Sequence, residues 1–156
     1  MRIDRTLYVG VSARTNRDGI AQLTGLLRRY DYEVRRVEVS GCLHLKSACS
    51  YIGNNTILVN RSLIDEQPLK MFELVDVPDR EAAAANALLV KEIVIIPASF
   101  PATYALLERK GFRLSSIDMS ELQKAEGGVT CTSVIFDDRG AQASLPALSS
   151  REENSR

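Results

Sequence analysis

The chain has 156 residues, 45% of them hydrophobic and 26% charged, which suits one globular domain that buries roughly two-thirds of its unfolded surface. Its 20 Lys and Arg residues balance 20 Asp and Glu residues, and this zero net charge argues against broad electrostatic binding to nucleic acid or membranes. No apolar run approaches the ~20 residues of a membrane span, and three cysteines without secretory context favour reduced thiols in a cytoplasmic protein.

The first part of the chain predicts a strand, a helix and a second strand. Residues 6–12 alternate between apolar and polar side chains, which is typical of a strand. Residues 18–29 carry four apolar side chains at helical spacing, and Asn16 or Asp18 can cap that helix. Residues 32–39 alternate again and predict the second strand.

The middle of the chain predicts a β-hairpin, a short helix and a further strand. A Gly-Asn-Asn turn at 53–55 separates a compact block at 45–52 from a strand at 56–59. A short helix over 61–71, interrupted by Pro68, and a strand over 72–77 are expected to follow.

The same order then recurs in the next forty or so residues. Two strands are predicted at 86–90 and 92–96, followed by a helix over 101–109 and a strand over 112–118. Proline stands at the first turn of this helix, and Ser99 is the expected cap.

The recurring order of strand, strand, helix and strand indicates a weak structural repeat. The opening strand–helix–strand and a closing strand over 129–136 are expected to supply a third unit. We therefore predict an α+β fold over residues 1–138. The remainder, 139–156, is rich in Ser, Ala, Arg and Glu and predicts a disordered tail.

Cys131 is the first candidate for chemistry, because it follows Gly127 and Gly128 closely. Glycines let backbone or substrate approach while the chain turns, so a thiol just beyond them is placed to face a pocket. His44 is the only histidine of the chain. The two residues fit a Cys–His pair for nucleophilic catalysis, whereas a buried strand cysteine and a surface histidine are the plainer alternatives.

Cys42 and Cys49 flank His44 on either side and raise the question of a metal site. Structural zinc sites usually show C-x2-C pairs, and this spacing does not match them. We therefore expect neither a metal nor an organic cofactor.

Four ordered motifs resemble the dimethylarginine dimethylaminohydrolase family, within the guanidino-group-modifying, or pentein, enzymes. They read YVGVSARTN at 8–16, LHLKS at 43–47, ANA at 85–87 and MSELQK at 119–124, and they lead to Cys131. Their order and approximate spacing follow the family, and the matching material corresponds to the C-terminal half of such an enzyme.

The resemblance implies an α/β-propeller of ββαβ modules around an active-site channel, present here as an incomplete propeller of about three modules. It implies a hydrolase that converts a methylated arginine to citrulline and an alkylamine through a Cys-thiouronium intermediate. Cys131 would be the nucleophile and His44 the general acid and base. Arg14 would bind the substrate α-carboxylate, and the backbone of Ala125 would contact the substrate.

The resemblance also implies groups that have no counterpart in this chain, namely carboxylates for the guanidinium and an acid that orients His44. We expect a fragment, a natural truncation or half of a split protein, whose partners are a guanidino small molecule and an N-terminal-half chain or a second copy. Glu126 is an outside candidate for one missing carboxylate. Two alternatives stay open: a non-catalytic module that binds a guanidino ligand or a partner chain, and an amidinotransferase or arginine deiminase-type activity.

Overall fold

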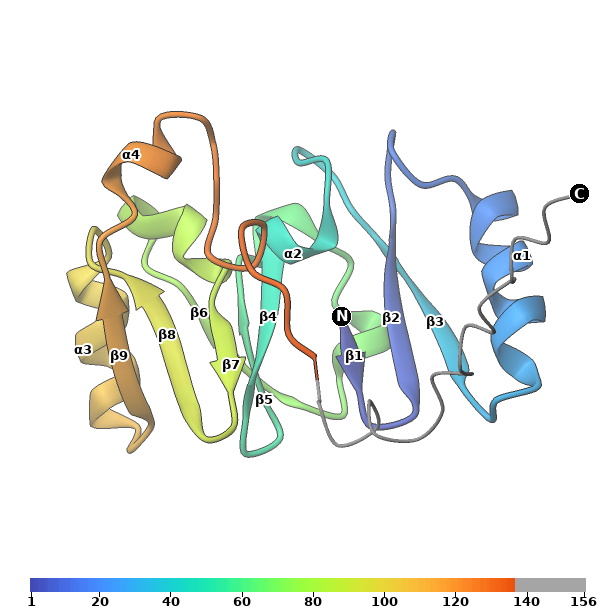
Figure 1. Cartoon of the computed structure of the whole chain (residues 1–156), viewed down its shortest axis with the longest axis horizontal. Helices are drawn as coiled ribbons and strands as arrows, with labels where there is room; N and C mark the ends of the chain where they lie inside the picture. Colours follow the sequence, from blue (N-terminus) through green and yellow to red (C-terminus); the bar gives the residue numbers. More distant parts are fainter. Residues whose placement is uncertain (137–156) are drawn as a thin grey trace, which may run out of the picture.

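Three units of two strands, a helical segment and a third strand follow one another along the chain (Figure 1). The computed structural model describes residues 1–136, so the predicted tail 139–156 and the end of the predicted domain 1–138 lie outside the described residues. Each unit forms a three-stranded sheet whose first pair of strands is antiparallel and whose second pair is parallel. The predicted α+β class and its three ββαβ modules are confirmed.

The first module consists of β1 (Arg2–Ile3), β2 (Thr6–Val11), α1 (Arg17–Arg28) and β3 (Glu33–Glu38). Asn16 caps α1, because its side chain accepts a hydrogen bond from the Gly19 N–H at 2.8 Å. The sequence predicts no strand before β2, and that prediction is wrong. Two residues are too few to show a strand periodicity, yet they pair with β2 and complete the module.

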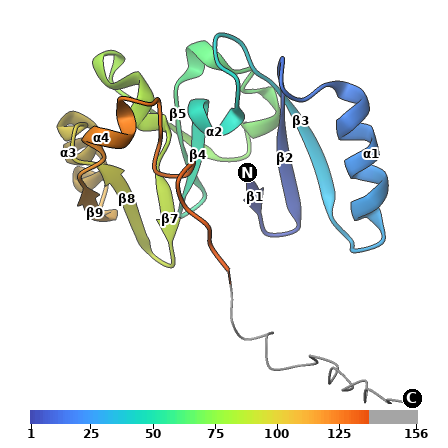
Figure 2. The ribbon, with the colours of Figure 1, turned by 45° about the horizontal axis from the view of Figure 1, so that its top comes forward.

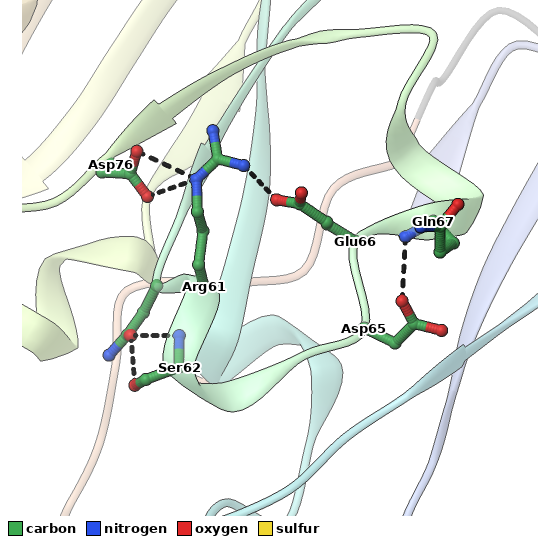
Figure 3. Close-up of polar contacts among 7 residues, drawn as sticks. Arg61, Ser62, Asp65, Glu66, Gln67 and Asp76 are labelled. Atoms are coloured by element: carbon green, nitrogen blue, oxygen red, sulfur yellow. Dashed lines mark hydrogen bonds and ion pairs between the residues drawn. The ribbon is translucent and has the colours of Figure 1, made fainter.

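The second module contains the following elements: α2 (Leu45–Ala48), β4 (Cys49–Gly53), β5 (Thr56–Val59), the 3-10 helices η1 (Arg61–Leu63) and η2 (Gln67–Leu69), and β6 (Glu73–Asp76). A short helix over 61–71 interrupted by Pro68 is predicted, and two short 3-10 helices form instead, the second of which contains Pro68. The Arg61 guanidinium pairs with Asp76 at 2.7 Å and with Glu66 (Figure 3). Because these contacts tie η1 to the end of β6 and to the start of η2, the segment bends rather than continuing as one helix.

The third module follows the 3-10 helix η3 (Asp79–Ala85) and contains β7 (Leu88–Val90), β8 (Ile93–Pro97), α3 (Pro101–Arg109) and β9 (Arg113–Ile117), after which α4 (Ser120–Gln123) leads to the cysteine. The predicted cap Ser99 is wrong, because its hydroxyl donates to Gln123 at 3.0 Å. Glu81 takes that place instead. Its carboxylate accepts from the Ala102 N–H at 2.9 Å and from the Thr103 N–H at 2.7 Å.

Strand β5 lies at the centre of the apolar core, and all four of its residues are buried. Ile57 and Val59 belong to a cluster shared with the first module, which also contains Tyr8 and Val37. Leu58, which points to the opposite face of the strand, belongs to a second cluster shared with the third module. The second module therefore lies between the other two, as both ribbon views show (Figures 1 and 2).

The segment 129–136 is not the predicted closing strand. Residues 129–131 form a turn, and the following residues pair with no strand among the described residues (Figure 2). Val129 is buried, whereas Val134 is 87% and Phe136 is 81% exposed. The β-branched composition is that of a strand, but this segment pairs with no sheet edge within residues 1–136.

Within the described residues, no helix has the length and apolar character needed to cross a membrane.

Replacing Glu81 by Ala is expected to destabilise the fold by about 1 kcal/mol, because two N–H groups at the start of α3 lose their acceptor. Asp79→Ala, in the same 3-10 helix, is the control, since Asp79 is exposed and does not bond to α3. Urea unfolding at neutral pH measures the difference. An equal loss in both variants would contradict the capping role.

The stabilisation by Glu81 is also expected to depend on pH. Burial opposes ionisation, but hydrogen bonds from Thr103 and Ala102 outweigh it and hold the pKa of the Glu81 carboxyl below its ordinary value. A depressed folded-state pKa stabilises the protein above the unfolded-state pKa, and this stabilisation is lost as the pH falls through the folded-state pKa. The stability difference between the wild type and Glu81→Ala should therefore shrink in acid.

Candidate functional site

Cys131 lies in the turn that follows α4 and the two glycines, not on a strand. Its N–H donates to the Gly128 carbonyl at 2.9 Å, which closes the turn. The residue is exposed, so the thiol is accessible to solvent and to a ligand. The sequence predicts a cysteine near the start of a strand beyond Gly127 and Gly128; the cysteine does follow the glycines closely, but the backbone that carries it is a turn.

Asn86, buried at the start of the third module, holds this turn through both atoms of its amide. The Nδ2 group lies 3.5 Å from the Cys131 Sγ as donor. The Oδ1 atom accepts from the Thr130 N–H and from the Thr130 hydroxyl, both at 2.9 Å. Gly128 allows this contact, because a Cβ at that position would lie 2.4 Å from Asn86 Nδ2.

Ser50 fixes the backbone on either side of Asn86. Its buried hydroxyl donates to the Ala85 carbonyl at 2.7 Å and accepts from the Ala87 N–H at 3.1 Å. A residue of β4 thereby sets the position of the asparagine that contacts the thiol. Sequence reasoning missed Ser50, and the only available signal was a small hydroxyl residue inside an otherwise apolar strand.

The thiol faces a hollow of about 320 Å³ between the second and third modules. Its wall is contributed by segments far apart in the sequence, including Ser47, Asn86, Phe100 and Gln123. Glu126 provides the one carboxylate among the described residues that line it. The hollow is thus mostly neutral, with one thiol and one acidic side chain at its rim.

The three cysteines differ in their ease of ionisation. Burial favours the neutral thiol at all three cysteines, and it raises the pKa of Cys42 and that of Cys49, the latter to about 12. At Cys131 the hydrogen bonds from the Gly128 backbone and from Asn86, together with the positive charge of Lys46, outweigh burial and lower the pKa below its ordinary value. Cys42 lacks such compensation, because its backbone contact at His44 does not offset burial.

His44 does not line the hollow at Cys131. It is exposed, directly precedes α2 and lines a different hollow together with Ser12. No hydrogen bond joins His44 to Cys131 within residues 1–136. The same segment nevertheless reaches the thiol, because Lys46 acts on it electrostatically and Ser47 lines its hollow. The Cys–His pair therefore stays a prediction.

Arg14 lies in the exposed loop between β2 and α1. Its N–H donates to the Ser12 hydroxyl at 3.2 Å, and that hydroxyl donates to the Leu43 carbonyl at 2.8 Å. These two bonds connect the Arg14 loop to the residue before His44. The structure brings the two segments together, while the substrate-binding role of Arg14 stays a prediction.

Ala125 is exposed in the turn after α4, where its N–H donates to the Leu122 carbonyl at 3.1 Å. Ala125 does not itself line the hollow at Cys131, although its neighbour Glu126 does, and the backbone contact with a substrate stays a prediction. Within residues 1–136 no group of three or more His, Cys, Asp or Glu side chains is arranged to hold a metal ion.

Comparison with known sequences identifies proteins that are similar to this chain. The N(G),N(G)-dimethylarginine dimethylaminohydrolase of Pseudomonas aeruginosa is 34% identical over 136 residues, which cover 87% of this chain and 54% of the relative. The chain thus spans about half the length of the curated relatives it matches. No protein-family model matches it.

Solved structures show the same relationship in three dimensions. A Cys-to-Ser variant of the dimethylarginine dimethylaminohydrolase of P. aeruginosa, in complex with citrulline, superposes with a TM-score of 0.80 at 33% identity, covering 87% of this chain and 53% of that one. An amidinotransferase from Microseira wollei, at 22% identity and a TM-score of 0.75, covers 83% and 44% and shares the fold. The chain is therefore homologous to dimethylarginine dimethylaminohydrolases over the matched part and has the pentein fold.

Selective alkylation of the three cysteines tests the electrostatics of the site. Trypsin places Cys42, Cys49 and Cys131 in the separate peptides 37–46, 47–61 and 125–139, so mass spectrometry can follow each rate with iodoacetamide. Cys131 should react fastest and at the lowest pH, because its thiolate forms most easily, and buried Cys49 should react last. Faster labelling of Cys42 than of Cys131 at neutral pH would contradict this description.

Proposed function

We propose that this chain contributes the nucleophile side of an amidine hydrolase site, which converts a methylated arginine to citrulline and an alkylamine. The observation that carries the proposal is the Cys131 thiol, which has a lowered pKa and faces a ligand-sized hollow. It occurs in a chain homologous to a dimethylarginine dimethylaminohydrolase that binds citrulline. A buried structural cysteine would have neither the exposure nor the lowered pKa.

The proposed reaction begins when the Cys131 thiolate attacks the guanidinium carbon and forms a C–S bond. The C–N bond to the methylated nitrogen then breaks, and His44 gives its proton to the departing alkylamine. Water attacks the resulting thiouronium carbon while His44 accepts a water proton. The C–S bond breaks, the second proton passes to solvent, and citrulline leaves with the thiolate restored.

His44 requires a change of position for this role, because its side chain lines a neighbouring hollow and not that of Cys131. His44 is close in sequence to the hollow at Cys131, since Ser47, three residues later, already lines that hollow. A substrate that fills the space between the two hollows would bridge them. Arg14, tied through Ser12 to the residue before His44, is the proposed clamp for the substrate α-carboxylate, by two hydrogen bonds.

We further propose that the described residues correspond to the C-terminal half of the homologous enzymes and that additional pentein modules complete the site. These modules belong to the same polypeptide, to a partner chain or to a second copy. A positively charged guanidinium needs carboxylates, and among the described residues that line the hollow Glu126 is the one carboxylate. The exposed apolar segment 134–136, which has the composition of a strand, offers these modules a surface to cover.

Citrulline release from asymmetric dimethylarginine tests the proposal. The chain is assayed alone and together with the co-expressed part of the P. aeruginosa relative that it does not match. Turnover should appear in at least the second assay, and Cys131→Ser should lower it by about a thousandfold or more, because a hydroxyl is a much weaker nucleophile.

Cys42→Ser is the matched control, since Cys42 lies outside the hollow and should be dispensable. Turnover that persists in Cys131→Ser would overturn the nucleophile assignment. Absence of turnover in both assays, with folded protein, would favour a non-catalytic module that binds a guanidino ligand.

A further inference from the structure

We infer that Asn86 is a positioning residue for the nucleophile: Nδ2 donates to the Cys131 Sγ, and Oδ1 holds the turn that presents it. The inference rests on the proposed function for its place in catalysis, but the contact itself is independent of any substrate. Two features of the structure carry it, namely the fixed orientation of the amide and the rigid support of the asparagine.

The orientation of the Asn86 amide is set by hydrogen-bond chemistry. The Thr130 N–H can only donate, so the amide atom 2.9 Å from it must be the oxygen. The amide nitrogen then necessarily points the other way, toward the Cys131 Sγ at 3.5 Å. A thiolate accepts such a bond better than a neutral thiol does, because the acceptor is charged. The contact therefore favours the reactive form.

The support of Asn86 leaves the amide little freedom. Ser50 bonds to the residues on both sides of it, and the Asn86 N–H donates to the Ala83 carbonyl at 3.2 Å. On its other side the amide meets the backbone of Gly128, where no Cβ would fit. Because the side chain is buried and held from several directions, it costs little entropy to keep it aimed at the sulfur.

The charged groups around the thiol are few. Lys46, from the helix α2, acts on Cys131 electrostatically, and Glu126, from the preceding turn, lines the same hollow. Neither bonds to Asn86, so both are left in place when Asn86 is replaced. The asparagine adds a donor at the sulfur without adding charge, which is a contribution distinct from that of Lys46.

Asn86→Asp separates the two functions of the amide. The aspartate keeps an oxygen for Thr130 but replaces the donor at the sulfur with a negatively charged acceptor. Iodoacetamide labelling of the 125–139 peptide near neutral pH should become about tenfold slower or more, because the thiolate loses a charge-assisted hydrogen bond and faces a like charge. The labelling profile should also shift to higher pH. An unchanged rate and profile would mean that Asn86 only supports the turn, and would overturn the inference.

Thr130→Val is the matched control, because it removes a hydroxyl at Oδ1 while Nδ2 keeps its partner. The Thr130 hydroxyl also helps to lower the pKa of Cys131, but less than Asn86 does, so labelling should slow less in Thr130→Val than in Asn86→Asp. Slow labelling of buried Cys49 reports that each variant is folded. The assay needs no turnover. The inference can therefore fail while the proposed function holds, and the proposed function can fail while the inference holds.

A measurement on the wild type keeps the inference open to refutation if Asn86→Asp does not fold. The side-chain N–H resonances of Asn86 should shift with pH at the same midpoint as Cys131 alkylation. They should stay constant over this range in Cys131→Ser. Asn86 side-chain N–H resonances that do not shift as Cys131 ionises would overturn the inference.

Discussion

The site depends on one buried amide, that of Asn86, which joins the third module to the turn bearing Cys131. Its oxygen accepts a hydrogen bond from the Thr130 N–H and its nitrogen donates to the Cys131 sulfur. The turn is therefore held in the position in which both amide atoms have a hydrogen-bond partner. Leaving such a buried group without partners costs roughly 1–3 kcal/mol, which explains why the turn is held in place. Gly128 follows from this constraint, because any side chain there would displace the amide.

The modular fold brings the remaining parts of the site together. Strand β5 places its two faces in two different apolar clusters, so the second module is fixed against both neighbours. Ser50 of β4 can then bond to the backbone around Asn86, and α2 brings Lys46 and Ser47 toward the thiol. Residues separated by 35 or more positions thus meet because adjacent modules share their core.

Features with a strong local signal could be predicted from the sequence. The β-branched run at 56–59, the Gly-Asn-Asn turn before it and the proline at the start of α3 correspond to elements with nearly the expected bounds. The two glycines before Cys131 likewise indicate a close approach of the chain near the thiol, although the strand expected to carry it is a turn.

Features that depend on distant partners could not be predicted. Glu81 caps a helix twenty residues away, and this replaces the local cap expected from Ser99. Strand β1 is defined only by its pairing with β2, while the segment 129–136 has strand composition but no partner within the described residues. The contact of Asn86 with Cys131 joins residues 45 positions apart, and composition carries no sign of it.

The central claim is that Cys131 forms a covalent bond to a guanidinium carbon. Acid quenching of the chain during reaction with asymmetric dimethylarginine, in the presence of the completing modules, followed by tryptic mass spectrometry, tests it most directly. The account predicts a substrate-derived mass increase on the 125–139 peptide, absent from Cys131→Ser. Turnover accompanied by an adduct on the Cys42 or Cys49 peptide instead, or by citrulline formation in Cys131→Ser, would contradict it.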